Sequence, residues 1–246
     1  MSFLSKLGSA IRTSSRVESL VSLQDYDVIL CDVTPQQLLK IAGQRLSEAY
    51  KRRLERFRYG PGVFKVDYAL SDLIPWRASE CARAATVYLG GSFEEIAASE
   101  RATRDGQPAD RPFVLLAQPS RFDPSRAPAG KHTAWAYCHV PNGSKVDMLA
   151  RLEDQIERFA PGFRETVLSR CAFFPADLER MDANLIGGDV GGGILDIRQF
   201  LFRPTWRHYA TSARDIYICS SSTPPGGGVH GMCGYHAARL ALARLP

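Results

Sequence analysis

The sequence lacks any hydrophobic run long enough to cross a membrane, and it lacks closely spaced cysteines. A transmembrane helix needs about 20 consecutive apolar residues, and the 246 residues contain no such run. The six cysteines, at positions 31, 81, 138, 171, 219 and 233, form no C-x-x-C pair. We therefore expect a cytoplasmic protein with no transmembrane segment, whose cysteines are buried, reduced thiols rather than a disulfide framework.

A strong charge imbalance, internal repeats and low-complexity tracts are also absent. The net charge of +5 is mild, and 45% hydrophobic with 23% charged residues is ordinary for a globular protein. The densest basic run, from Lys51 to Arg58, is broken by Glu55. On a helix such a run favours a solvated face over a nucleic-acid patch, so we expect no nucleic-acid partner.

The N-terminal segment has two interpretations. Residues 1–16 contain no acidic residue and several serines, as a transit peptide would. The favoured interpretation is structural: a helix end, a turn at Gly8 and a strand from Ile11 to Val17.

The C-terminal segment has the pattern strand, glycine loop, helix. Gly226, Gly228 and Gly231 match G-x-G-x-x-G between the apolar run 216–219 and an Ala/Leu/Arg segment. Amides without side chains at a helix N-terminus suit an anion or a ring carbonyl. The usual dinucleotide motif continues to a second strand and an acidic residue, and here no acidic residue lies beyond Asp215. We therefore expect no adenine-dinucleotide site from this segment alone.

Hydrophobic periodicity predicts an α+β fold. Residues 26–31 are typical of a buried parallel strand, and residues 34–44 and 47–57 of helices. From Val63 the period changes to two, which predicts four strands of a mixed or antiparallel sheet, at 63–68, 85–89, 112–118 and 132–140. Helical spacing at 93–103 and 146–159 predicts helices on one face of that sheet, and a third helix follows Gly162.

Several reactive side chains have simpler structural interpretations. His230, Cys233 and His236 cannot converge on a metal from one helix at this spacing, so no metal site is expected. Serines 220–222 with His230 and Asp215 lack the G-x-S-x-G elbow of a nucleophile, and turn chemistry is favoured.

Two strand residues keep open alternatives. Lys65 and Asp67 share a strand face, which favours an exposed ion pair. His139 is expected on the opposite face of its strand from His132 and Cys138. It lies either in the core at that strand or facing a substrate pocket.

The segment TPPGGGVHGMCGYHAA resembles the C-terminal flavin-contact segment of FAD-dependent oxidoreductases of the phytoene desaturase and carotenoid isomerase family, in particular their pyridine nucleotide-disulfide oxidoreductase domain 2-like branch. The resemblance extends through RFRYGPGVFKVDYAL, RPFVLLAQPSRFDP and APAGKHTAWAYCHVPNGS. Family members begin with a βαβ unit that carries G-x-G-x-x-G. The chain therefore resembles the C-terminal half of such an enzyme.

The resemblance implies FAD as cofactor, an apolar small-molecule substrate, and a flavin-contact set matched position by position. That set is Thr223, Pro225, Gly226, Gly227, Gly228, Val229, His230, Gly231 and Met232. Thr34 and Pro35 would lie near the cofactor, and a lysine such as Lys65 reaching the flavin would stabilise its reduced form. No catalytic residue is assigned.

The resemblance also implies a domain organisation. Residues 1–58 would be part of the FAD-binding domain, residues 59–185 the substrate domain, and residues 186–246 a return to the FAD-binding domain. The glycine-rich segment 184–193 would lie against flavin or substrate, the alternative being a flexible connection.

A missing ADP-binding unit implies a partner. It would be a separately encoded N-terminal half, without which the chain is incomplete. The alternative from another class is a non-enzymatic α+β module that binds a hydrophobic ligand or a partner protein.

Overall fold

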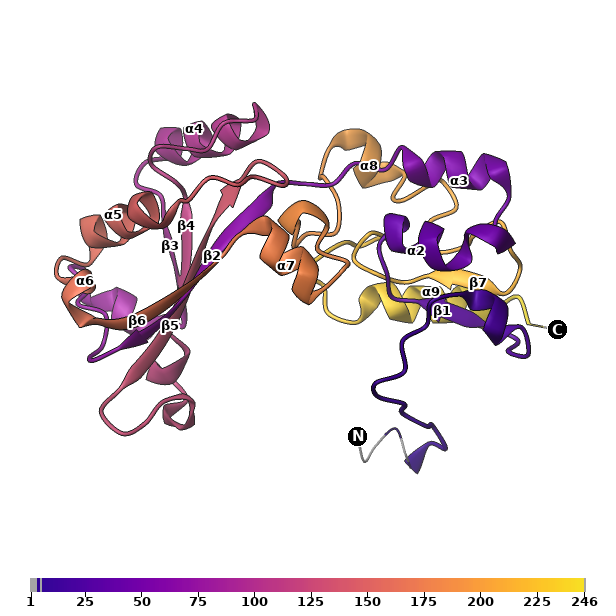
Figure 1. The fold of residues 1–246 in the computed structure, drawn as a ribbon, viewed down its shortest axis with the longest axis horizontal. Helices are drawn as coiled ribbons and strands as arrows, with labels where there is room; N and C mark the ends of the chain where they lie inside the picture. Colours follow the sequence, from indigo (N-terminus) through magenta and orange to yellow (C-terminus); the bar gives the residue numbers. More distant parts are fainter. Residues whose placement is uncertain (1–3, 5, 246) are drawn as a thin grey trace.

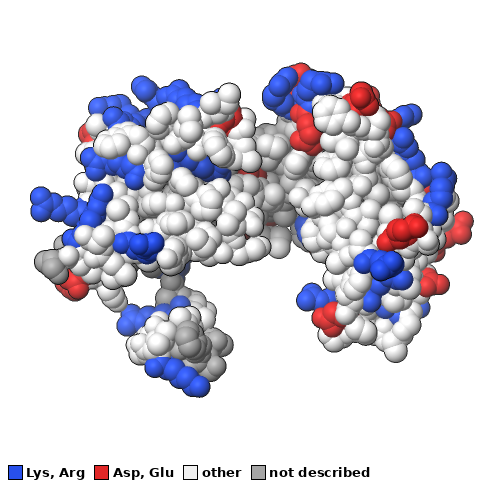
Figure 2. Space-filling view, turned by 180° about the vertical axis from the view of Figure 1, so that it is seen from behind, with Lys and Arg blue, Asp and Glu red and all other residues white. Residues whose placement is uncertain are grey.

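The structure is a computed structural model that describes residue 4 and residues 6–245. Figure 1 shows two lobes, one around a long twisted sheet and one around two short strands. Figure 2 shows Lys and Arg side chains spread over both lobes with Asp and Glu among them. No helix in the described part of the chain is long and apolar enough to span a membrane.

The larger lobe is built on an antiparallel sheet. Among the described residues its strands run in the order β3-β4-β5-β2-β6, and each neighbouring pair is antiparallel. Their bounds are β2 Gly62–Leu70, β3 Thr86–Leu89, β4 Val114–Ala117, β5 His132–Val140 and β6 Val167–Phe173. The four predicted strands are confirmed, and β6 is a fifth that the sequence prediction missed. As an edge strand with mostly exposed residues, β6 has no hydrophobic alternation to reveal it.

One face of this sheet is covered by α5 (Leu149–Phe159) and α6 (Phe163–Thr166). Leu152 and Ile156 of α5 pack with Met148 and Phe163 against the inward side chains of β2 and β5. The predicted partner helix, α4 (Phe93–Arg104), starts with a Ser92–Glu95 capping box. The buried core of the sheet contains no described α4 residue, so α5 provides most of the helical cover.

The smaller lobe combines segments from both ends of the chain. Strands β1 (Ile29–Cys31) and β7 (Ile216–Ile218) pair in parallel, as predicted for the first of them. The helices are α2 (Pro35–Ala42), α3 (Glu48–Glu55), α8 (Ile197–Leu201) and α9 (Met232–Leu242). Leu38, Tyr50 and Leu54 of α2 and α3 pack on the strands in a core separate from that of the larger lobe.

Residues 174–188 and 58–61 connect the lobes. Helix α7 (Pro175–Met181) follows β6 and leads to a short 3-10 turn at Ile186–Gly188. Asn142 Nδ2 donates to the carbonyls of Gly60 and Ile186, both at 2.9 Å. The further 3-10 turns are Leu20–Leu23, Gly43–Arg45, Ser79–Arg83, Pro119–Arg121 and Pro124–Arg126. Antiparallel and parallel pairing with separate helices confirms the α+β class.

Two predictions were wrong. Residues 11–17 are not a strand, because this exposed segment meets no described backbone that could pair with it. Cys171 is exposed rather than buried, because it lies on the edge strand β6. Residues 1–3 and 5, which belong to the N-terminal segment with two interpretations, lie outside the described residues.

Candidate functional site

The glycine loop connects β7 to the N-terminus of α9. Gly226, Gly228 and Gly231 have φ of +99°, +80° and +74°, a region that L side chains rarely adopt. A Cβ at any of these three positions would meet no atom within 4 Å. These glycines therefore serve the backbone conformation, and they leave one side of the loop open.

Backbone donors gather on this loop. Among the described residues, the amides of Gly227, Gly228 and Gly231 donate no hydrogen bond within the chain. Gly231 is the N-cap of α9, whose 11 residues direct the positive end of their dipole toward the loop. Cys233 is buried, and its Sγ lies 3.6 Å from the carbonyl oxygen of Thr223 and 3.7 Å from that of Gly226. The buried Cys233 side chain thus supports the loop, while the amides of the loop remain available to donate hydrogen bonds to a ligand.

A second glycine segment, residues 187–193, is organised by the buried Asp189. Its carboxylate accepts hydrogen bonds from the amides of Gly60, Gly191 and Gly193, each at 2.7 Å. Arg203 is also buried and donates to the carbonyls of Gly191 and Gly192 at 3.1 and 2.8 Å. Burial lowers the pKa of the Arg203 guanidinium, and the nearby Asp189 carboxylate opposes that shift.

The two glycine-rich segments lie against each other. Ser222 Oγ donates to the carbonyl of Gly192 at 2.8 Å. A Cβ on Gly192 would overlap Ser221 Oγ, and one on Gly227 would lie 3.2 Å from the Gly191 carbonyl oxygen. Segment 187–193 is therefore packed onto the loop that leads to α9.

A polar cavity of about 180 Å³ opens beside these segments. Thr34, Ser220, Ser221 and Asp32 contribute to its wall, together with Asp182, Asn184, Leu185, Asp189, Val190 and Gly192. The amide of Thr34 donates to Asn184 Oδ1 at 2.9 Å, which holds the start of α2 against the residues just before the second segment. Thr34 therefore shares a cavity with the serines that precede the glycine loop.

Among the described residues, no hydrogen bond joins Ser220, Ser221 or Ser222 to His230 or Asp215. Asp215 pairs with Arg45 at 2.5 Å, and the buried Ser222 uses its hydroxyl on Gly192. The described residues also contain no group of three His, Cys, Asp or Glu side chains suited to a metal.

The other strand residues are placed as period two predicts. Lys65 and Asp67 form the predicted ion pair, and Lys65 Nζ also lies 5.2 Å from the Phe173 ring centroid. His139 Nδ1 lies 3.0 Å from the carboxylate of Glu100 on α4. Cys138 points to the opposite face and is fully buried.

An aromatic surface lies on the sheet, and none of its residues belongs to the flavin-contact set expected from the sequence. Trp135 and Tyr137 stack at 6.1 Å on the face opposite the buried core, and Tyr88 stacks on Phe113 at 5.8 Å. Burial raises the pKa of the Tyr137 hydroxyl. The alternation of β5 contained the signal, since aromatic residues occupy its outward positions.

Known relatives are oxidoreductases by name. The chain is 29% identical to pyridine nucleotide-disulfide oxidoreductase domain-containing protein 2 from Rattus norvegicus, over 94% of this chain and 42% of that protein. It is 27% identical to a phytoene desaturase (lycopene-forming) from Pseudescherichia vulneris, over 54% of this chain and 29% of that protein. The chain is similar to oxidoreductases. No family model matches it.

A solved structure supports the fold. An oxidoreductase from Methanosarcina mazei superposes with a TM-score of 0.54 at 13% identity, covering 90% of this chain and 44% of that one. The chain thus spans less than half the length of these similar proteins.

Proposed function

We propose that the chain is the substrate domain and C-terminal flavin-contact segment of an FAD-dependent oxidoreductase. The observation that carries this proposal is the glycine loop at the N-terminus of α9, with its free amides and open side. The similarity to pyridine nucleotide-disulfide oxidoreductase domain-containing protein 2 extends over nearly the whole chain and supports the same assignment.

The residues present fit the flavin end of such a cofactor. The amides of Gly227, Gly228 and Gly231 would donate to ring oxygens or nitrogens, and the α9 dipole would favour negative charge there. Pro225, Val229, His230 and Met232 would border the ring, and the buried Thr223 would support the loop from below. When bound, FAD supplies the redox chemistry, and the protein orients the substrate.

The substrate in this proposal is an apolar small molecule. The outward face of the sheet offers the rings of Trp135, Tyr137, Tyr88 and Phe113, which suit contact with an apolar body. Lys65 lies on the same face, where its ammonium group is 6.0 Å from the Trp135 ring centroid and pairs with Asp67. We leave the catalytic acid or base unassigned.

A further part of the cofactor site would come from outside these residues. The parallel pair β1–β7 has three residues in each strand, whereas parallel sheets normally have more strands with both faces covered. Leu30 of β1 is 41% exposed. We propose that an ADP-binding βαβ unit, supplied by a separately encoded half or another part of the protein, completes this sheet.

Flavin binding by the purified chain tests the proposal. Because this chain would contact the ring rather than the ADP moiety, FAD and riboflavin, which has the same ring but no phosphate, should bind with dissociation constants within about threefold of each other. Quenching of flavin fluorescence measures both. If neither flavin binds, the proposal is overturned. The alternative function, a non-enzymatic module with exposed apolar surfaces, would then be favoured.

A matched pair of glycine variants locates the binding. Gly228 and Gly106 have φ of +80° and +81°, with open space beside both, so alanine costs a similar backbone strain at each. Gly228→Ala should weaken flavin binding by about tenfold, because it places a methyl group on the open side of the loop. Gly106→Ala, between α4 and β4, should leave binding unchanged, and equal effects would contradict the assigned loop.

A further inference from the structure

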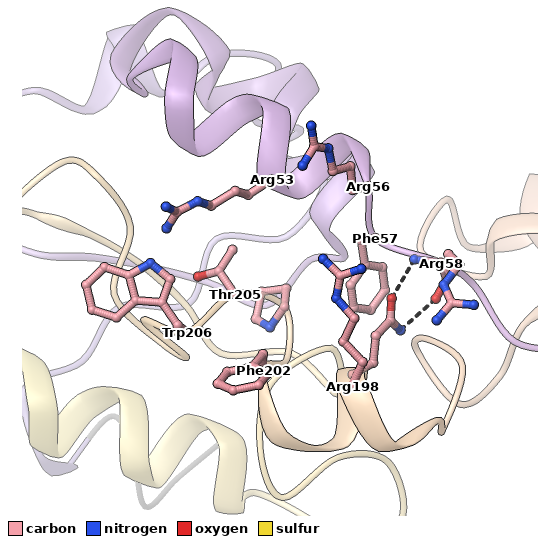
Figure 3. Close-up of a pocket in the computed structure, with 10 residues that line it drawn as sticks. Arg53, Arg56, Phe57, Arg58, Arg198, Phe202, Thr205 and Trp206 are labelled. Carbon is pink, nitrogen blue, oxygen red and sulfur yellow. Dashed lines mark hydrogen bonds between the residues drawn. The ribbon is translucent and has the colours of Figure 1, made fainter.

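A second pocket, of about 400 Å³, lies between α3 and α8 and shares no lining residue with the glycine loop or the polar cavity. Its lining combines four arginines, Arg53, Arg56, Arg58 and Arg198, with Phe57, Phe202 and Trp206 (Figure 3). The volume is in the range of small-molecule sites. No acidic side chain is among its described lining residues.

The charges in this pocket are largely uncompensated. Arg58 pairs with Asp196, but Arg53, Arg56 and Arg198 have no ion-pair partner among the described residues. Figure 3 shows Arg198 reaching from α8 toward the C-terminal end of α3, where Arg56 lies. Guanidinium groups that face one another across a hollow repel, and an anion between them removes that repulsion.

The walls of the pocket are fixed before any ligand arrives. Gln199 of α8 accepts from the amide of Arg58 at 2.7 Å and donates to its carbonyl at 2.9 Å. Asp196 caps α8 by accepting from the Gln199 amide at 2.8 Å. The Arg53 guanidinium lies 5.8 Å from the centroid of the exposed Trp206 ring. The cationic groups are thus placed on a preformed frame beside an aromatic surface.

We propose that this pocket binds a phosphate group attached to an aromatic or apolar body. Phosphate carries nearly two negative charges and three terminal oxygens, which match several guanidinium groups better than one carboxylate does. The body would contact Trp206 and Phe202, which line the pocket and are 57% and 52% exposed. In Figure 2, Lys and Arg side chains gather along the upper edge of the smaller lobe, where Figure 1 places α3 and α8.

The phosphate could belong to a free monoester or to a lipid head group, and two probes separate these sources. Adenosine 5′-monophosphate is titrated calorimetrically, with uncharged adenosine as its control. Vesicles of phosphatidic acid, whose head group is a phosphate monoester, mixed with phosphatidylcholine are tested by co-sedimentation, with pure phosphatidylcholine as their control. Binding to the monophosphate identifies a soluble ligand, and binding to the anionic vesicles alone identifies a head group.

Arginine variants test whether the probes bind in this pocket. Arg56→Gln and Arg198→Gln should each weaken binding about tenfold, the effect of losing one charge-assisted hydrogen bond. Arg52→Gln removes the same charge from α3 at an exposed position outside the pocket, and it should change binding less than about twofold. No binding to either probe, or equal effects of all three variants, would overturn the proposal. Flavin binding at the glycine loop does not depend on this outcome.

Discussion

Asp189 shows how one buried charge organises a site. Its carboxylate accepts the amides of Gly60, Gly191 and Gly193, which belong to segments far apart in sequence. A carboxylate with three N–H donors is well satisfied despite its burial. The second glycine segment is therefore held in place beside the loop that precedes α9, rather than acting as a free connection.

Cys138 makes stability depend on pH. Burial, with a smaller contribution from Glu100, raises the pKa of its thiol from 9.0 to about 12. Above pH 9 the unfolded thiol loses its proton while the folded one keeps it, so stability falls by up to about 1.4 kcal/mol per pH unit until the folded pKa is reached. Cys138→Ala should be less stable at neutral pH, and its deficit should shrink between about pH 9 and pH 11. Urea unfolding across this range measures the deficit, and a constant value would refute the expectation.

At the scale of elements, the start of β2 depends on close backbone approach. A Cβ on Gly62 would overlap the carbonyl oxygen of Gly187, and its other neighbour is Pro175. Gly43, at the C-terminus of α2, has open space and a helical backbone with φ of −53°. Gly62→Ala should therefore destabilise by about 2 kcal/mol or more, whereas Gly43→Ala should be neutral or stabilise by up to about 1 kcal/mol. Thermal unfolding of both variants measures the change in stability. A stability change of the same sign in both variants would contradict this packing.

At the scale of the whole molecule, the two lobes have separate hydrophobic cores. The smaller lobe rests on two three-residue strands, so it should unfold at a lower urea concentration than the larger lobe. Tryptophan reports on each part, since Trp206 lies in the smaller lobe and Trp76 and Trp135 in the larger one. A variant in which Trp206 is the remaining tryptophan should show its fluorescence transition at the lower urea concentration. The Trp206→Phe variant, which retains Trp76 and Trp135, should show its transition at the higher one. Coincident transitions would mean that the lobes unfold as one unit.

Local patterns were enough to predict most elements. Alternation over residues 63–68 and 132–140 and helical spacing over 146–159 depend on neighbouring residues, so the sequence by itself determined strands β2 and β5 and helix α5. The same holds for the position of the glycine loop before α9, because positive φ demands glycine.

Contacts between distant segments were decided by the tertiary structure. The family resemblance assigned residues 29–31 and 216–218 to one domain, but local patterns contain no sign that they pair, or that Asp189 accepts hydrogen bonds from the amides of residues 60 and 193. The sequence also does not indicate that Arg198 lies beside the basic run of α3. That run, considered alone, favoured a solvated helix face. Periodicity predicts which side of a helix or strand is apolar. It does not predict which distant segment that side packs against, because this contact forms only when the chain folds. The physical reason is that hydrogen bonds and charges act across space, independently of the separation along the chain.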